Sequence, residues 1–186
     1  PEMKVTMIRH GDTEATLRRL YYGSTDLPLL PQSAQALEAN AALYPKAPRY
    51  FTSGMLRTEQ TFQTIYGDQP HEILPGLREM DFGRFEMHSY EELKDDPDYR
   101  RWCGDSEHLP CPGGEDAQAV LVRSLQAIDG LLEAGIDACG VIHGGGIASL
   151  MMHWFGGIRY DYSLAPGQGF TVTFSGKTPE RYEKIP

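Results

Sequence analysis

Apolar residues gather in short runs along the chain, and each run has the length of a single strand. Lys4 to Ile8, Tyr50 to Thr52, residues 138–142 and Phe170 to Phe174 are dominated by β-branched, aromatic and other apolar side chains. Such runs are typical of strands buried inside a sheet. The pair Ile73-Leu74 predicts a further, brief strand.

Segments with helical spacing separate these strands. The Ala/Leu-rich stretch from Pro31 to Leu43 predicts a helix that opens with proline at its first position. Ser53 is expected to cap the next helix, which carries Phe62 and Ile65 on one face together with Thr58. Arg57 would then lie in the first turn of that helix and point back toward the preceding strand.

The clearest helix of the chain follows residue 114. Glu115 and Asp116 suit the positive N-terminal end of a helix dipole, and Gly135 is expected to end the helix. Residues 147–155 predict one more helix. The apolar stripe of the clearest helix consists of Ala117, Leu121, Leu125, Ile128 and Leu132.

Two long segments lack a sustained period. Residues 11–30 hold Gly23, Asp26 and Pro28 and are expected to form a loop, whereas residues 75–113 predict short helices in an excursion over the sheet edge. The alternation of strands and helices elsewhere favours an α/β fold, a three-layer α/β/α sandwich with a mostly parallel mixed sheet. No linker divides residues 1–186, so a single domain is expected.

The composition limits the class of partner. A formal net charge of −9 argues against nucleic acid or an anionic membrane as the main partner. A site for an anionic small molecule must therefore be built from local arginines. The candidates are Arg9, Arg18, Arg19, Arg57, Arg78 and Arg84.

The cysteines and the ends of the chain suggest a compartment. Three cysteines without C-x-x-C spacing make a disulfide framework or a zinc site an unfavourable interpretation. No charged segment precedes an apolar one as in a secretory leader, and the apolar stretches are too short for a membrane span. We therefore expect a cytoplasmic protein with reduced thiols.

Two histidines follow predicted strands and run directly into glycine. Arg9-His10-Gly11 ends the first strand, and His143-Gly144-Gly145 ends the strand at 138–142. The carboxyl ends of strands in an open α/β sheet are where ligands bind. Histidine is a nucleophile when neutral, and arginine binds two phosphoryl oxygens at once. The pattern therefore predicts a site for phosphoryl chemistry, with a small-molecule phosphate ester as ligand.

Five sequence blocks, in order along the chain, resemble the signatures of the histidine phosphatase superfamily, in its phosphoglycerate-mutase-like branch. They are Ile8-Arg9-His10-Gly11-Asp12-Thr13-Glu14, Ser53-Gly54-Met55-Leu56-Arg57-Thr58, Leu77–Glu86, Pro112-Gly113-Gly114-Glu115 and His143-Gly144-Gly145.

The resemblance implies a role for each matching residue. His10 would be the phosphorylated nucleophile, with Arg9, Arg57 and His143 as the phosphate pocket and Glu79 as the proton donor. No metal or organic cofactor is implied. Asp81 and Glu86 are close enough in sequence to be alternative acids.

The first loop and two differences from the family pattern bear on the identity of the substrate. Leu20-Tyr21-Tyr22-Gly23 is similar to small bacterial phosphatases of the α-ribazole phosphatase type, which makes α-ribazole 5′-phosphate a possible substrate. Thr16 stands where the family often has a phosphate-binding asparagine, and Met87 replaces a common glycine. Thr16, Tyr22, Gly23 and Gly144 are further expected substrate contacts.

Several alternatives remain open from the sequence. A phosphoglycerate mutase and a non-catalytic binder of phosphorylated ligands are the alternatives to a phosphomonoesterase. The pair Arg18-Arg19 either binds a second anionic group or is a solvated part of the loop. Tyr21 and Tyr22 either stack on an aromatic substrate or pack over the core.

Overall fold

The computed structural model describes residues 1–186, and its centre is a six-stranded mixed sheet in the order β3-β2-β4-β1-β5-β6. The first four strands in that order are parallel, β5 is antiparallel to β1, and β6 is antiparallel to β5. The α/β fold expected from the sequence is confirmed. The strands are β1 (Glu2–Arg9), β2 (Arg49–Thr52), β3 (Glu72–Ile73), β4 (Ala138–Ile142), β5 (Gly169–Ser175) and β6 (Thr178–Ile185).

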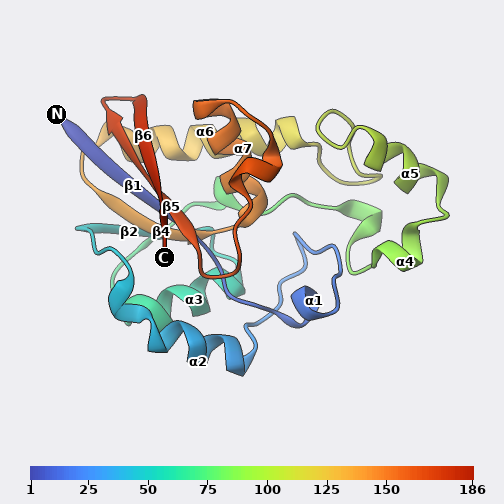
Figure 1. Cartoon of the computed structure of the whole chain (residues 1–186), viewed down its shortest axis with the longest axis horizontal. Helices are drawn as coiled ribbons and strands as arrows, with labels where there is room; N and C mark the ends of the chain where they lie inside the picture. Colours follow the sequence, from blue (N-terminus) through green and yellow to red (C-terminus); the bar gives the residue numbers. More distant parts are fainter.

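Helices cover both faces of the sheet, as Figure 1 shows. On one face lie α2 (Pro31–Ala39) and α3 (Leu56–Tyr66), and on the other lie α6 (Ala117–Glu133) and α7 (Gly144–Phe155). Each face has its own apolar core because side chains alternate along a strand. No helix combines the length and the apolar character that crossing a membrane requires.

The alternation is clearest in β1, the strand that ends at the site. Val5 and Met7 belong to the core beneath α6 and α7, whereas Ile8 belongs to the core beneath α2 and α3. All three side chains are fully buried. Burial on both faces fixes the register of the strand, because a shift by one residue would exchange its two faces.

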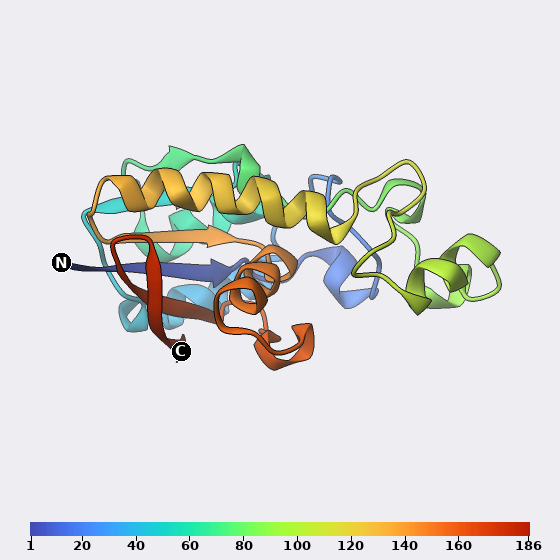
Figure 2. The ribbon, with the colours of Figure 1, turned by 90° about the horizontal axis from the view of Figure 1, so that it is seen from above.

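Residues 75–113 form an excursion beyond the sheet, as predicted, and contain only short helices. Figure 2 shows α4 (Tyr90–Leu93) and α5 (Pro97–Gly104) at the end of the molecule toward which the arrows of β1 and β4 point. A third apolar cluster holds this excursion together, with Phe85, Tyr99 and Trp102 at its centre. The remaining short helices are α1 (Glu14–Leu17), η1 (Ala41–Leu43), η2 (Pro75–Leu77), η3 (Gly83–Phe85) and η4 (Arg159–Tyr162).

Several local predictions were wrong. The predicted helix at 31–43 ends at Ala39, and a separate turn covers residues 41–43. Helix α1 interrupts the expected loop at 11–30, since a capping box between Thr13 and Thr16 stabilises one helical turn. Strand β6 was missed because it is an exposed edge strand whose charged residues give no apolar alternation.

Helix starts account for the other corrections. The helix predicted from residue 147 begins at Gly144, directly after His143. The N-cap of α3 is Met55 rather than Ser53, because Gly54 adopts a positive φ of 86° and delays the start of the helix. Glu115 and Asp116 were expected to start α6, but Asp116 is its N-cap, accepting a hydrogen bond from the Ala119 N–H, and Glu115 lies outside the helix.

Candidate active site

The register of two neighbouring strands brings the two histidines together. In the parallel pair β1–β4, Arg9 lies opposite Ile142, and each is followed directly by a histidine. The His10 and His143 rings therefore lie side by side at the carboxyl edge of the sheet, with their centroids 5.2 Å apart. The structure thus brings together the two histidines that the sequence analysis assigns to one site.

His10 is buried in a form suited to nucleophilic attack. Its Nδ1–H donates to the carbonyl oxygen of Gly11 at 2.7 Å, which leaves the Nε2 lone pair free. Burial, and then the nearby Arg57 guanidinium, lowers the pKa of His10 to about 3. The imidazole is therefore neutral at neutral pH.

His143 is fully buried and has one ring nitrogen without a partner. Its Nε2 lies 2.8 Å from the Ser53 hydroxyl oxygen, and its Nδ1 has no hydrogen-bond partner. The same hydroxyl oxygen accepts the Met55 N–H at 3.3 Å. A Ser53 proton donated to His143 Nε2 would place the imidazole proton on Nδ1, and the Ser53 hydroxyl also lies 3.3 Å from the Thr58 hydroxyl oxygen. Burial, followed by His10 and Arg57, lowers the pKa of His143 well below its usual value.

Arg57 is also fully buried, which is costly for a cation. Its Nη1 and Nη2 donate to the carbonyl oxygens of Thr25 and Gly23, each at 2.8 Å, while its Nε has no partner. The Tyr22 ring lies over the guanidinium, 4.8 Å from its carbon. These partners are neutral, so Arg57 is held in place without a direct ion pair.

Arg9 lies across the start of α7. It donates from Nη1 to the carbonyl oxygen of Leu164. A Cβ on Gly144 would lie only 3.1 Å from the Arg9 Cδ, so glycine at this position lets the arginine lie flat against the helix. Gly144 also lines the cavity, as was expected for a substrate contact.

Glu79 is the one carboxyl group among the residues that line the cavity with His10. Its carboxylate lies against the start of α7, where a Cβ on Gly145 would come within 2.7 Å of the Glu79 Oε1. Glycine at position 145 therefore leaves room for the carboxylate. Asp81 accepts bonds from Gly83 and Ser24 and does not line the cavity. The choice of Glu79 over its sequence neighbours therefore agrees with the geometry.

Glu86 has a different task. Its carboxylate accepts the N–H groups of Gly23, Thr25 and Phe82 and the hydroxyl of Thr25. Burial alone would raise the pKa of Glu86, but these hydrogen bonds outweigh it and lower the pKa. Glu86 therefore fixes residues 23–25, whose carbonyl groups in turn hold Arg57.

The residues of the first loop reach the site to different degrees. Tyr22 lines the cavity, and its hydroxyl lies 2.8 Å from the Thr16 Oγ1. Thr16 and Gly23 do not line the cavity: Thr16 contacts it through Tyr22, and Gly23 contacts Arg57. Met87 does not line it either, but it adopts a positive φ of 63°, where glycine is favoured.

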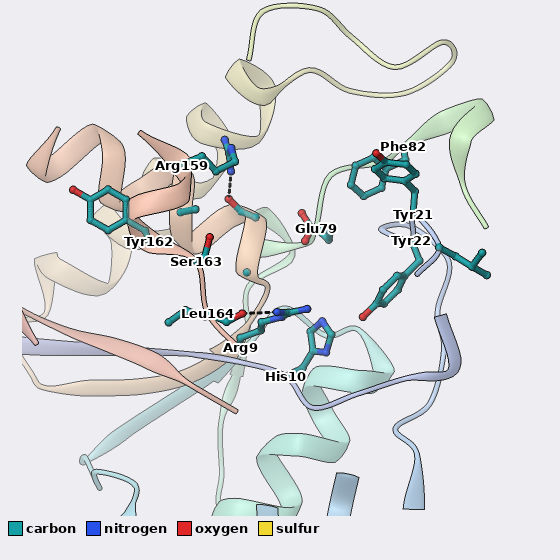
Figure 3. Close-up of a pocket in the computed structure, with 14 residues that line it drawn as sticks. Arg9, His10, Tyr21, Tyr22, Glu79, Phe82, Arg159, Tyr162, Ser163 and Leu164 are labelled. Atoms are coloured by element: carbon teal, nitrogen blue, oxygen red, sulfur yellow. Dashed lines mark hydrogen bonds between the residues drawn. The ribbon is translucent and has the colours of Figure 1, made fainter. Parts of the chain in front are cut away.

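Figure 3 shows the cavity above His10, with a volume of about 410 Å³. Sequence reasoning missed the wall formed by Arg159, Tyr162, Ser163 and Leu164. These residues belong to η4 and the loop after it, where no periodic pattern marks them. No group of three or more His, Cys, Asp or Glu side chains is placed to hold a metal ion, and all three cysteines are free.

The sequence matches the histidine phosphatase superfamily (branch 1) over residues 5–167. The chain belongs to this superfamily. An adenosylcobalamin/alpha-ribazole phosphatase of Salmonella typhimurium is 33% identical over 127 residues, which cover 65% of this chain and 63% of that protein. A 2,3-bisphosphoglycerate-dependent phosphoglycerate mutase of Xanthobacter autotrophicus is 26% identical over 80% of this chain and 79% of that protein.

A solved structure of the superfamily has the same fold throughout. The crystal structure of a putative alpha-ribazole-5′-P phosphatase from Escherichia coli superimposes with a TM-score of 0.88 at 25% identity. The match covers 98% of this chain and 95% of that one. The sequence alignment with the curated phosphatase relatives, in contrast, spans only 63% of their length.

Proposed function

We propose that this histidine phosphatase superfamily member is a phosphomonoester hydrolase that acts through a phosphohistidine at His10. One observation carries the proposal: the free Nε2 of a neutral His10 lies beside two buried nitrogens without partners, Arg57 Nε and His143 Nδ1. Buried donors are rarely left unpaired, because the loss of a partner costs about 1–3 kcal/mol. A phosphoryl group would supply the missing acceptors.

The charge of the phosphoryl group is met by Arg9 and Arg57, with His143 as a further donor. The guanidinium groups donate only to backbone carbonyls and form no direct ion pair, which leaves both able to pair with an anion. Preorganised donors of this kind stabilise a transition state without rearrangement during the reaction. In the proposed role, His143 donates from Nδ1 while Ser53 fixes its tautomer.

In the first step, the lone pair of His10 Nε2 attacks phosphorus, and the bond from phosphorus to the ester oxygen breaks. The leaving alkoxide takes a proton from Glu79, which enters the step as the carboxylic acid. In the second step, Glu79 accepts a proton from water while the water oxygen attacks phosphorus. The P–N bond breaks, and inorganic phosphate and neutral His10 are formed.

The alcohol part of the substrate lies toward Tyr21, Phe82 and Tyr162, which line the cavity beyond His10. Relatives named as alpha-ribazole phosphatases make α-ribazole 5′-phosphate the first ester to test. Relatives named as phosphoglycerate mutases make 3-phosphoglycerate the necessary comparison.

The deciding experiment compares the wild type with His10→Ala and with His153→Ala, an exposed histidine on α7. We expect phosphate release, with or without EDTA, from the wild type and from His153→Ala only. A rapid quench should trap an acid-labile phosphohistidine. Equal turnover by His10→Ala would refute the mechanism. Tight ester binding without phosphohistidine would indicate a binding protein, and faster interconversion of phosphoglycerates than hydrolysis would indicate a mutase.

A further inference from the structure

Besides Arg9, a second arginine lines the cavity, at the end away from His10. Arg159 belongs to η4, and Figure 3 shows it on the far side of Glu79 from His10. No sequence motif points to this residue. In the proposed function the alcohol of the substrate lies at this end, so Arg159 bears on which alcohol is accepted.

Four of the five N–H groups of Arg159 have hydrogen-bond partners. Its Nε and Nη2 bind the two carboxylate oxygens of Glu107 at 2.7 and 3.0 Å. Its Nη1 donates to the carbonyl oxygen of Gly145 at 2.9 Å, and Nη2 also donates to the Ser149 hydroxyl at 2.8 Å. A two-pronged arginine–carboxylate pair is geometrically specific and balances the charge of both partners.

The contrast with the other two arginines is one of charge rather than of position. Arg9 and Arg57 donate to carbonyl groups and form no direct ion pair, whereas Arg159 is paired with the Glu107 carboxylate. Hydrogen bonds from Arg159 lower the pKa of Glu107, so the carboxylate stays ionised at neutral pH.

No other cation serves this end of the cavity. The side chains of Arg18 and Arg19 are exposed on the first loop, where Arg18 lies 3.9 Å from Glu14, and neither lines the cavity. The remaining walls are apolar and aromatic, and a smaller adjoining cavity of about 180 Å³ is lined by both Arg159 and Glu107 together with Trp102.

We propose that the Glu107–Arg159 pair determines substrate specificity by keeping the alcohol-binding end of the cavity electrically neutral. The proposal rests on the phosphatase function inferred above. The pair favours phosphomonoesters whose alcohol is uncharged. It disfavours esters that carry a second anionic group, since such a group would meet a compensated arginine and the Glu79 and Glu107 carboxyls.

Two esters of nearly equal size separate charge from shape. Glycerol 3-phosphate and 3-phosphoglycerate differ only in a hydroxymethyl group against a carboxylate. We expect the wild type to have the higher kcat/KM for glycerol 3-phosphate, whose alcohol part is uncharged. Glu107→Gln retains an oxygen that accepts from Arg159 but removes the negative charge. This variant should raise the ratio of kcat/KM for 3-phosphoglycerate to kcat/KM for glycerol 3-phosphate about tenfold. An effect of this size corresponds to the interaction with one charge in a partly solvated site.

A reverse variant and a matched control complete the design. Arg159→Met leaves Glu107 unpaired and should lower the same ratio below that of the wild type. Glu2→Gln removes the carboxylate of an exposed Glu2–Arg181 pair far from the cavity and should leave the ratio unchanged. Glu107→Ala serves if the glutamine variant does not fold.

A binding measurement separates this proposal from the proposed function. The dissociation constants of both esters are measured by calorimetry in the His10→Ala background, with and without the Glu107 and Arg159 changes. If no variant turns over any ester, the phosphatase function fails, while the binding ratio still tests the pair. If the ratio does not move in Glu107→Gln, or if neither ester binds, the specificity proposal is overturned.

Discussion

The two ends of the cavity above His10 differ in how the polar groups around them are paired. Near His10, the buried Arg57 Nε and His143 Nδ1 lack partners, and the Arg57 guanidinium donates only to carbonyl groups. At the other end, Arg159 forms an ion pair with Glu107 and also donates to Gly145 and Ser149. The buried groups near His10 therefore lack the kind of partners that Arg159 already has.

This difference shows which polar groups are buried at a cost to the stability of the fold. Burying Arg57 and two histidines without full hydrogen bonding costs free energy that a structural role would not justify. The Arg159 pair, which is about one-third exposed, makes no such demand. The unpaired groups therefore identify the phosphate end more reliably than the number of arginines does.

The largest expected effect comes from exchanging the arginines for lysine. Lysine keeps the charge but loses the planar donor fork. Arg57→Lys should lower kcat/KM for an ester of an uncharged alcohol by about 10²–10³-fold, which is the cost of losing a preorganised transition-state donor. Arg159→Lys should lower it by no more than about threefold, since an exposed pair contributes little. Steady-state kinetics with both variants checks the contrast, and equal losses would contradict it.

The next prediction concerns stability at low pH. Burial and Arg57 hold the pKa of His10 at about 3, below its unfolded value, so the unfolded chain takes up a proton that the folded chain refuses. Stability is thus fully present above about pH 6.5 and is lost as the pH falls toward 3. Between pH 7 and 5, His10 alone should account for about 2 kcal/mol of lost unfolding free energy.

Urea unfolding at pH 7 and pH 5 measures this loss. His10→Gln cannot titrate, so its stability should fall by about 2 kcal/mol less than that of the wild type over the same interval. His153→Gln, exposed on α7, is the control and should behave as the wild type does. A parallel fall in all three proteins would show that His10 is not buried in its neutral form.

A smaller effect is expected from the hydroxyl that orients His143. Ser53→Ala removes the partner of Nε2 and allows the imidazole proton to move to that nitrogen. We expect kcat to fall about tenfold, within the cost of an unsatisfied buried group, with little change in KM. Ser149→Ala removes a hydroxyl partner of Arg159 at the other end and should leave kcat nearly unchanged. Stopped-flow measurement of the phosphorylation step distinguishes the two.

The end of the cavity at His10 could be predicted from the sequence, whereas at the other end only Tyr21 was considered as a substrate contact. His10, His143 and Arg57 follow strands or begin a helix, so the apolar pattern that predicts the sheet also places them at its edge. Tyr21, Phe82 and Arg159 come from three irregular segments that meet only in the folded chain. Their positions depend on long-range packing, for which no local pattern exists.

Ser53 shows the same limit on a smaller scale. A serine before a helix is normally a cap, and the sequence offers no sign that Gly54 delays the helix and frees the hydroxyl for His143. Local rules predicted the residue to be important to a helix, whereas a contact with a residue 90 positions away gives it its role.

The smallest expected effect concerns Met87, which contacts Tyr21 at the end of the cavity away from His10. Its N–H donates to the carbonyl of Tyr21, which lines the cavity, yet its φ of 63° is strained for a residue with a side chain. Met87→Gly should be more stable than Met87→Ala by about 1 kcal/mol, because both lose the same contacts and only glycine relieves the strain. Thermal unfolding compares them. If the alanine variant is as stable as the glycine variant, the positive φ of residue 87 carries no measurable strain.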